Sequence, residues 1–249
     1  MPEPFSARVR ARFAAGAAAY AGGSPLQRAV AWRLVRMLKP LPIPEGPCAD
    51  LGAGSGAVVQ AAAELRPDLL QRSPLEIDLS APLLARNPLG GRQLIWNLNR
   101  GLPEGLEQAA LLSSSFALQW LDDPPGQLAR WCSSLRSGGV LALALPTSGS
   151  FPQWHQAAVG SGVPCTALPL PSSESLIRIA SDQLRILHRQ RLRFSRPGRG
   201  LALLRQMRAI GADATTSASL SGSELRRLLR HWPRGPTTWE VLVLLGIRR

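Results

Sequence analysis

Residues 50–56 read Asp50-Leu51-Gly52-Ala53-Gly54-Ser55-Gly56, with a glycine at every second position directly after an acidic residue. Glycine has no Cβ, so it adopts positive φ easily and lets a ligand approach the main chain closely. Three glycines in five residues therefore indicate a turn whose N–H groups face a nucleotide-like molecule. The dinucleotide fingerprint requires its third glycine one position later, where this chain has Ala57. The pattern thus favours a ligand other than NAD without excluding NAD.

A second acidic residue, Asp78, ends the apolar segment that starts at Leu75. A carboxylate at the end of the second strand of an α/β unit accepts hydrogen bonds from the two hydroxyls of a ribose. The alternative is that Asp78 caps the helix that follows, since aspartate is a good N-cap. The glycine turn and Asp78 together favour the ribose role.

Strand and helix patterns alternate around these motifs, which indicates βαβ units and a doubly wound α/β domain. Apolar runs predict strands over residues 48–51, 75–79, 93–98, 109–118 and 140–145. The intervening helices are expected over residues 57–65, 82–86 and 124–135. Ligands bind at the carboxyl ends of the strands in such domains, so both acidic motifs should lie at one edge of the sheet.

The two ends of the chain follow other patterns. Helices are expected over residues 5–20 and 25–38, and the latter places apolar side chains four residues apart. The strand and helix alternation ends at Pro146, the segment 147–172 is rich in Pro, Ser and Gly, and a partly exposed or edge strand is expected over 185–194. Helices over 201–211 and 223–232, the second capped by Ser221 or Ser223, lead to a buried last strand over 239–247.

The basic residues concentrate at the two ends of the chain. The 249 residues carry a formal net charge of +13, and 45% of them are apolar, enough for one large domain or a core with a lid. Residues 1–39 hold seven Lys or Arg and one acid, and residues 178–249 hold fifteen Arg and four acids. Basic ends of this kind fit nucleic acid, an anionic membrane or an acidic protein as a partner. The alternative is a bias of genome composition, because Lys39 is the only lysine.

Cysteine usage and hydropathy exclude several classes of protein. The three cysteines, Cys48, Cys132 and Cys165, are far apart, which fits free thiols in a reducing compartment and disfavours a disulfide framework or a metal site. No apolar run approaches 18 residues, so we expect no membrane span and a cytoplasmic protein. The Arg- and Ala-rich residues 5–20 are also compatible with an organelle transit peptide.

With these features the chain resembles class I S-adenosylmethionine-dependent methyltransferases. Several segments are further similar to the malonyl-acyl-carrier-protein O-methyltransferases of biotin synthesis. These segments are Arg12-Phe13-Ala14-Ala15-Gly16-Ala17-Ala18-Ala19-Tyr20 with Leu26-Gln27-Arg28, Ser114-Ser115-Phe116-Ala117-Leu118-Gln119-Trp120, Gly149-Ser150-Phe151-Pro152-Gln153-Trp154-His155-Gln156-Ala157, and Met207-Arg208-Ala209-Ile210-Gly211-Ala212. Their order and spacing cover nearly the whole chain.

The resemblance implies a Rossmann-like seven-stranded methyltransferase sheet with helices on both faces. Residues 1–40 would form an N-terminal helical lid, and residues 41–249 the methyltransferase domain, with a helical insertion at about 196–235. The implied methyl donor is S-adenosyl-L-methionine, and the implied partner is an acidic acyl carrier protein bearing a malonyl group, with no nucleic acid, membrane or metal. The chain departs from the family pattern at Ala53, which replaces a cysteine, and at Asn97 or Asn99, which replaces the acid that contacts adenine.

The resemblance also assigns site residues. The donor would be bound by Asp50, Gly52, Gly54, Gly56, Asp78, Asn97 and Ser114. A malonyl carboxylate has a pKa of about 4 and is already ionised at neutral pH, so no catalytic base is expected. The candidates for the substrate pocket are Tyr20, Gln119, Trp120 and His155, and each of the aromatic and His side chains could instead serve packing alone.

Two other readings of the function remain open. The same fold could methylate another small acid or a quinone precursor, or the chain could be a methyltransferase-like assembly factor that transfers no methyl group. A nucleic-acid methyltransferase is disfavoured, because the motif Asn-Pro-Pro-(Tyr/Phe) is absent from residues 113–120.

Overall fold

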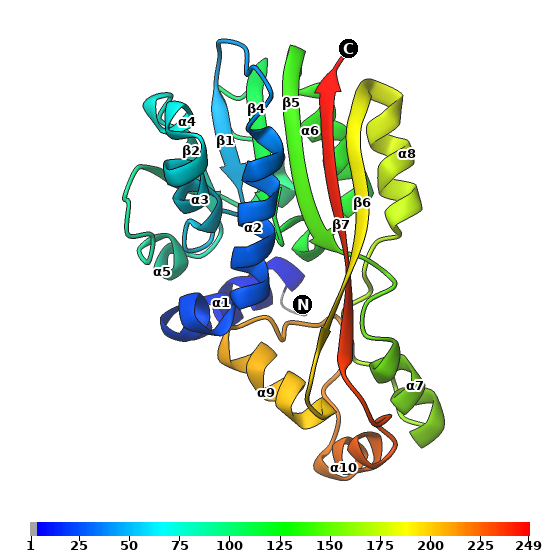
Figure 1. Cartoon of the computed structure of the whole chain (residues 1–249). Coiled ribbons are helices and arrows are strands. Elements are labelled where there is room, and N and C mark those ends of the chain that lie inside the picture. Colours follow the sequence, from blue (N-terminus) through cyan, green and yellow to red (C-terminus); the bar gives the residue numbers. More distant parts are fainter. Residues whose placement is uncertain (1–3) are drawn as a thin grey trace.

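The computed structural model describes residues 4–249 and is organised around one seven-stranded sheet (Figure 1). The strand order is β3-β2-β1-β4-β5-β7-β6, and β7 runs antiparallel to both of its neighbours while the other adjacent pairs are parallel. The strands are β1 (Cys48–Leu51), β2 (Leu75–Asp78), β3 (Arg92–Ile95), β4 (Ala109–Ser115), β5 (Leu135–Pro146), β6 (Leu184–Arg196) and β7 (Thr237–Arg248). The predicted Rossmann-like seven-stranded fold is confirmed.

Helices cover both faces of this sheet. On one face, α2 (Pro25–Leu38) buries Val30, Leu34 and Leu38 against β4, β5 and β7, and α3 (Ala57–Leu65) and α4 (Pro67–Gln71) lie beside it. On the other face, α6 (Pro124–Ser133) and α8 (Ser173–Gln183) bury Trp131 and Leu176 against the same strands. Each central strand therefore has apolar side chains on both faces, as expected for buried parallel strands.

A second, smaller layer lies below the sheet in Figure 1. It contains α7 (Pro152–Ser161), α9 (Gly200–Ala209), α10 (Gly222–Arg230) and the lower ends of the long strands β6 and β7. Its own apolar cluster includes Phe151, Trp154, Leu203, Leu228 and Trp232. We call this part of the molecule the satellite layer.

The first helix, α1 (Phe5–Gly23), joins the sheet domain to the satellite layer, because it packs on both α5 (Ala81–Leu84) and α9. Its contact with the segment after α9 is made by main chain. A Cβ on Gly16 would lie 2.4 Å from the backbone of Gly211, and a Cβ on Gly211 would lie 2.3 Å from the carbonyl oxygen of Arg12. Gln206 of α9 also donates a hydrogen bond of 2.8 Å to the carbonyl of Gly23. We call these contacts the α1–α9 clasp.

Most predicted elements are present with boundaries shifted by a few residues. The segment 147–172, for which the sequence predicts no element, contains α7, which starts with Pro152 at its first position, and α8 follows at residue 173. Proline is tolerated in the first turn of a helix, where its missing N–H leaves no carbonyl unpaired. The Pro-, Ser- and Gly-rich composition of this segment therefore gave no signal for the start of either helix. Residues 96–98, predicted as strand, leave β3 and enter a short 3-10 turn, η1 (Leu98–Arg100).

Two negative findings apply to residues 4–249. No helix in this range is both long and apolar enough to span a membrane. The same range contains no group of three or more His, Cys, Asp or Glu side chains arranged to hold a metal ion.

Candidate functional site

The glycine turn that follows β1 has the backbone that its sequence predicts. Gly52, Gly54 and Gly56 adopt φ of 75°, 56° and 79°, a region that residues with a side chain rarely enter. A Cβ on Gly52 would lie 2.1 Å from the Cβ of Ala117, so the turn also touches the segment after β4. The N–H groups of Gly52 and Ala53 donate to the carbonyl of Ile77 at 2.8 and 2.9 Å, which ties the turn to β2.

Asp78 at the end of β2 is held by the same turn. Its Oδ2 accepts a hydrogen bond from the N–H of Gly54 at 2.9 Å, and its Oδ1 accepts one from the N–H of Ser80 at 2.7 Å. Burial raises the pKa of Asp78, while these two backbone N–H groups lower it. The bond from Ser80 is a local turn contact and not the helix cap that the sequence left as an alternative, because Ser80 is the N-cap of α5 (Ala81–Leu84) and no side chain caps this helix. The bond from Gly54 ties Asp78 to the glycine turn.

The carboxyl groups of Asp50, Glu76 and Asp78 lie close to one another at this edge of the sheet, and the first two are buried. Asp50 is 2% exposed, and burial raises its pKa to about 7. A hydrogen bond of 2.9 Å from Ser113 lowers this pKa but does not offset the effect of burial. Burial likewise raises the pKa of Glu76 to about 7, and Asn87 donates to it at 2.6 Å. The second oxygen of Asp50 has no hydrogen-bond partner. A buried carboxylate without a partner is costly, so the site is suited to a ligand that carries positive charge or N–H donors.

Asp50 and Asp78, but not Glu76, line a cavity of about 140 Å³, which we call the glycine-turn cavity. Asp50, Gly52, Gly54, Asp78 and Asn97 all border it, as the sequence predicts for a binding site. Other lining side chains were not predicted from the sequence. They include Phe13 and Arg10 of α1, Trp32 of α2, Trp96, and Ser55 of the turn itself.

Two residues predicted to bind the cofactor lie outside this cavity. Ser114 is fully buried and donates to the carbonyl of Leu51 at 2.8 Å, whereas its neighbour Ser115 borders the cavity and leaves its hydroxyl unpaired. Alternation along β4 explains the difference, because successive side chains point to opposite faces. Gly56 is the N-cap of α3, and a Cβ there would lie 2.4 Å from the side chain of Asn87. The glycine at this position therefore allows Asn87 to pack closely on the turn.

Asn97 and Asn99, between which the sequence could not choose, both border the glycine-turn cavity. The side-chain oxygen of Asn97 accepts from the N–H of Asn99 at 3.0 Å, and its amide group donates to Ser6 of α1 at 3.4 Å. The oxygen of Asn99 accepts from the N–H of Asp122, and its Nδ2 is buried without a partner. The Nδ2 of Asn99 is therefore an unpaired donor in a residue that borders the cavity, whereas Asn97 is hydrogen-bonded to α1 through Ser6.

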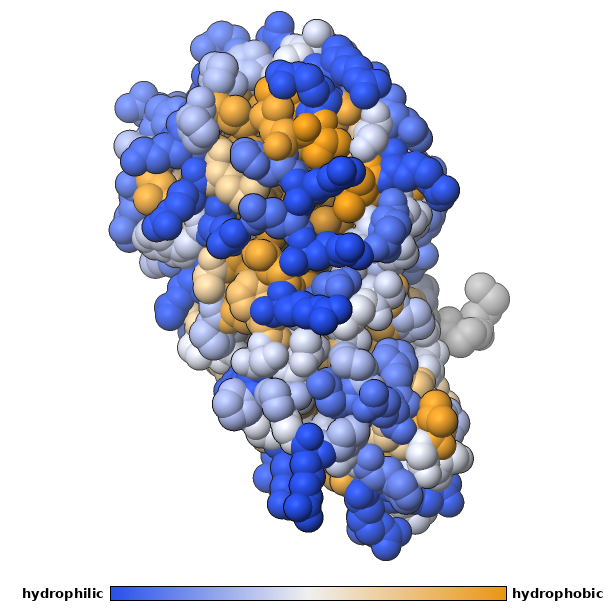
Figure 2. All heavy atoms as spheres, turned by 45° about the vertical axis from the view of Figure 1, so that its right-hand side comes forward, coloured by the Kyte–Doolittle hydropathy of each residue, from blue (hydrophilic) through white to orange (hydrophobic). Residues whose placement is uncertain are grey.

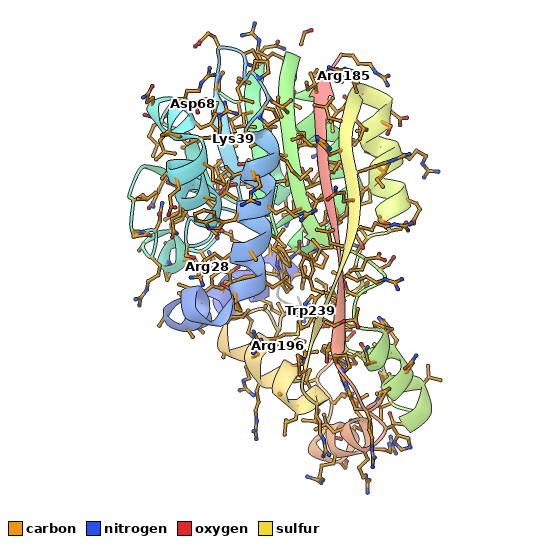
Figure 3. All side chains as sticks on the ribbon, viewed as in Figure 1. Arg28, Lys39, Asp68, Arg185, Arg196 and Trp239 are labelled. Carbon is orange, nitrogen blue, oxygen red and sulfur yellow. The ribbon has the colours of Figure 1, made fainter. Side chains whose placement is uncertain are left out.

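A second cavity of about 680 Å³ lies between the sheet domain and the satellite layer, and we call it the satellite cavity. Its walls come from α1, from the segment after β4, from residues 166–170 and from the satellite layer. Figure 3 labels two of its lining residues, Arg196 near α9 and Trp239 on β7. The predicted pocket residues Tyr20, Gln119 and Trp120 border this cavity.

Four aromatic side chains border both cavities and form the junction between them: Phe13, Tyr20, Phe116 and Trp120. Phe13 meets Trp120 edge to face with ring centroids 5.3 Å apart, and it meets Tyr20 at 6.0 Å. Burial, with a smaller effect from Asp78, raises the pKa of Tyr20 well above its usual value, so its hydroxyl stays protonated. A group bound in one cavity would meet a group bound in the other at this aromatic junction.

His155 is placed differently from its prediction as a substrate-pocket residue. It is exposed on α7, borders neither cavity, and lies 3.4 Å from the sulfur of Cys165. The neighbouring Trp154 is buried and does border the satellite cavity. On a helix, side chains at adjacent positions point about 100° apart, so a shift of one residue exchanges the inner and outer faces.

The chain is similar to several curated proteins. It is 29% identical over 247 residues to the biotin biosynthesis bifunctional protein BioCD of Bordetella avium. The matched segment covers 91% of this chain and 49% of that protein. It is 40% identical over 112 residues to a trans-aconitate 2-methyltransferase of Deinococcus radiodurans. This match covers 43% of this chain and 41% of that protein. It is 26% identical over 226 residues to a malonyl-[acyl-carrier protein] O-methyltransferase of Magnetococcus marinus, over 82% of this chain and 78% of that one. The chain thus spans less than half the length of the first two relatives.

Solved structures share the fold. A SAM-dependent methyltransferase of Thermotoga maritima superposes with a TM-score of 0.54 at 15% identity, covering 97% of this chain and all of that one. A geranyl diphosphate C-methyltransferase of Streptomyces coelicolor, solved with S-adenosyl-L-homocysteine, superposes with a TM-score of 0.52 at 15% identity and covers 89% and 79% of the two chains. No protein-family model matches the chain. The resemblance to class I methyltransferases, and to the malonyl-carrier enzymes among them, is confirmed.

Proposed function

We propose that this chain is an S-adenosylmethionine-dependent carboxyl O-methyltransferase that converts the free carboxylate of a malonyl thioester to its methyl ester in biotin biosynthesis. The observation that carries the proposal is the aromatic junction, where Phe13, Tyr20, Phe116 and Trp120 border both cavities. A donor in the glycine-turn cavity and an acceptor in the satellite cavity would meet there. The curated relatives named for malonyl-carrier methylation support the choice of acceptor.

The residues of the glycine-turn cavity fit this donor. Asp50 has an unpaired buried oxygen, which suits the positive charge of the donor, and Asp78 stands at the ribose position. The absence of a Cβ at Gly54, where an added Cβ would have only the ring of Tyr20 nearby at 3.9 Å, leaves the main chain open to the ligand. When bound, S-adenosylmethionine supplies a methyl group whose bond to sulfur breaks with both electrons left on sulfur, while the acceptor oxygen forms the new bond to carbon.

The protein's own groups then position the acceptor and exclude water. The malonyl carboxylate is already ionised at neutral pH, with a pKa of about 4, so no side chain has to remove a proton. The aromatic faces of Tyr20 and Trp120 favour a neighbouring cation and desolvate the nucleophile. Of the lid proposed for residues 1–40, only α1 would cover the cavities, because α2 is packed in the core against β4, β5 and β7. The segment 196–235 would form the opposite wall.

The partner that delivers the malonyl group is proposed to be an acidic acyl carrier protein. The satellite layer presents exposed arginines, among them Arg205, Arg208, Arg226, Arg227 and Arg230, and Arg208 borders the satellite cavity. Figure 2 shows hydrophilic side chains projecting from this lower end of the molecule. Long-range attraction of this kind is screened over about 8 Å in physiological salt. We expect turnover of the carrier-bound substrate to fall steeply with salt while donor binding hardly changes.

The test is formation of S-adenosylhomocysteine from S-adenosylmethionine with malonyl-carrier protein, with free malonate and without acceptor. We expect product with the malonyl carrier well above both other reactions, and rescue of a biotin-requiring strain that lacks its own methyltransferase. Donor binding without turnover of any acceptor would contradict the proposal and favour an assembly or binding role.

A second candidate acceptor is a small free polycarboxylic acid. It is favoured by the 40% identity to a trans-aconitate 2-methyltransferase, although the matched segment covers only 43% of this chain. Turnover of trans-aconitate in the same assay, with none of the malonyl carrier, would select this alternative.

A further inference from the structure

One residue besides the four aromatic side chains borders both cavities, and it is Gln27 in the first turn of α2. Figure 1 shows this end of α2 above α9, where the sheet domain meets the satellite layer. The proposed methyl transfer would take place at the aromatic junction, so a polar group there would face the acceptor. Gln27 supplies the only side-chain amide at the junction within residues 4–249.

The side-chain amide of Gln27 is accessible from these cavities. The side chain is half-buried and has no hydrogen-bond partner within residues 4–249, yet its polar atoms are not among the fully buried unpaired atoms of the interior. Gln119, by contrast, borders the satellite cavity with an amide oxygen that is fully buried. A ligand at the aromatic junction can therefore accept a hydrogen bond from Gln27, because a free amide group carries two N–H donors.

The other polar groups of the junction are also neutral donors. They are the hydroxyl of Tyr20 and the indole N–H of Trp120, and both residues are half-buried. No Lys or Arg among residues 4–249 borders both cavities. An acceptor carboxylate at the junction would thus meet neutral hydrogen-bond donors and no cationic side chain.

The arginines of the two cavities lie to either side of the junction. Arg10 and Arg28 border the glycine-turn cavity alone, and Arg196 and Arg208 border the satellite cavity alone. The charged groups that line the cavities are therefore kept away from the position where the acceptor would meet the donor.

Neutral donors suit a reaction in which both charges disappear. The carboxylate oxygen forms a bond to the methyl carbon while the bond from carbon to sulfur breaks, so a carboxylate and a sulfonium become an ester and a thioether. A cation fixed at the carboxylate would bind the ground state more tightly than the transition state and would repel the sulfonium, and both effects slow the reaction. An amide donor keeps its hydrogen bond throughout, because the oxygen that does not react remains an acceptor as the ester carbonyl.

We infer that Gln27 is an acceptor-binding residue, whose side-chain amide donates to the non-reacting oxygen of the acceptor carboxylate and directs the other oxygen toward the methyl group. The inference rests on the proposed function, since it concerns the reacting end of the acceptor. It assigns this end to a neutral hydrogen bond instead of an arginine.

The experiment measures kcat/KM for the malonyl carrier in Gln27→Leu, Gln27→Glu and the control Gln71→Glu. Gln71 is exposed at the end of α4 and borders neither cavity, so its variant adds the same charge away from the site. Loss of a hydrogen bond to a charged group should lower kcat/KM about tenfold or more in Gln27→Leu. Repulsion of the carboxylate should lower it about fivefold further in Gln27→Glu, and Gln71→Glu should match the wild type.

The affinity for S-adenosylmethionine separates this role from a structural one. Gln27→Glu should bind the donor at least as tightly as the wild type, because the added carboxylate attracts the sulfonium. Glutamate also suits the first turn of a helix, so this variant should remain folded. Equal losses of donor affinity and of acceptor turnover, or equal kcat/KM in Gln27→Glu and Gln71→Glu, would overturn the inference.

Failure of the wild-type protein to turn over the malonyl carrier would instead contradict the proposed function. Calorimetry then compares the S-ethyl thioester of malonate with its methyl ester, each added to protein saturated with S-adenosylhomocysteine. The inference requires Gln27→Glu to bind the acid about fiftyfold more weakly than the wild type, and the uncharged ester only about fivefold more weakly. Equal changes for the two ligands, or no binding of the acid to the wild type, would overturn it.

Discussion

The glycine-turn cavity and the satellite cavity meet at one aromatic junction, but they are built in different ways. One wall of the first is formed by main chain and short side chains at the carboxyl ends of β1, β2 and β4, and the opposite wall is formed by side chains of α1 and α2. The second is formed by large side chains from α1, α7, α9 and α10, which come together from both ends of the chain. A cavity made of main chain is sensitive to any added atom, whereas a cavity made of side chains is sensitive to the chemistry and position of each one.

The largest expected effect is that of a methyl group added inside the glycine turn. In Gly52→Ala the new Cβ would lie 2.1 Å from the Cβ of Ala117, and φ of 75° is unfavourable for alanine. We expect the free energy of unfolding to fall by about 2–5 kcal/mol, measured by chemical denaturation, with loss of donor binding. The control Gly90→Ala has a similar φ of 64° but no atom within 4 Å, and should lose only about 1–2 kcal/mol. Equal losses would show that the contact with Ala117 is unimportant.

The next largest effect is expected at Asp78, whose carboxylate borders the glycine-turn cavity. Asp78→Ala removes an acceptor for the N–H of Gly54 and for a ribose, and hydrogen bonds to a charged group contribute about 1.5–3 kcal/mol. We expect at least tenfold weaker binding of S-adenosylmethionine, measured as lost thermal stabilisation by the ligand. Asp68→Ala, which removes an exposed carboxylate paired with Arg66, is the control and should retain the stabilisation. Full stabilisation of Asp78→Ala would remove this residue from the site.

The same contrast explains what the sequence could predict. The strand at 48–51, the glycine conformations and the placement of Asp50 and Asp78 follow from local signals, since a strand end and a tight turn are encoded by adjacent residues. Ser114, predicted to bind the cofactor, is buried one residue before Ser115, which borders the cavity. Alternation alone cannot reveal which face of a strand borders a cavity.

The satellite layer could not be predicted in the same way, because its contacts are distant in sequence. Gly16 and Gly211 touch through their main chains although 194 residues separate them, and nothing local marks either glycine as a contact. No element was predicted where α7 starts at Pro152, and His155, predicted for the pocket, lies one position from Trp154, which borders the satellite cavity. Phe13 had a usable signal, since it lies seven residues before Tyr20 and hence on the same face of α1.

A third prediction tests whether the α1–α9 clasp holds the two halves together. In Gly16→Ala the new Cβ would lie 2.4 Å from the backbone of Ile210 and Gly211, which cannot move as a flexible side chain would. We expect the free energy of unfolding to fall by about 1–3 kcal/mol. Gly22→Ala in the same helix meets no atom within 4 Å and should be neutral or slightly stabilising, since alanine favours helix. Denaturation curves that coincide for the two variants would exclude a tight clasp.

The smallest effect is the pH dependence of donor binding. We expect this dependence to arise from the buried carboxyl groups near the glycine-turn cavity and not from residues of the satellite cavity. Burial raises the pKa of both Asp50 and Glu76 to about 7, so the folded protein retains protons between about pH 4 and 7 that the unfolded chain releases. The free energy of unfolding of the ligand-free protein should therefore fall as pH rises through this window and level off above pH 7.

Binding of the positively charged donor should show the opposite trend, because the donor favours the ionised carboxylates. We expect its affinity to weaken about tenfold between pH 7.5 and 5.5, with uptake of protons on release of the ligand, measured by calorimetry in two buffers. Asp50→Asn should bind more weakly at pH 7.5 and lose much of this dependence, whereas Trp154→Phe in the satellite cavity should keep it unchanged. An affinity that is constant from pH 5.5 to 7.5 in the wild-type protein would show that the buried carboxyl cluster does not change its protonation when the donor binds.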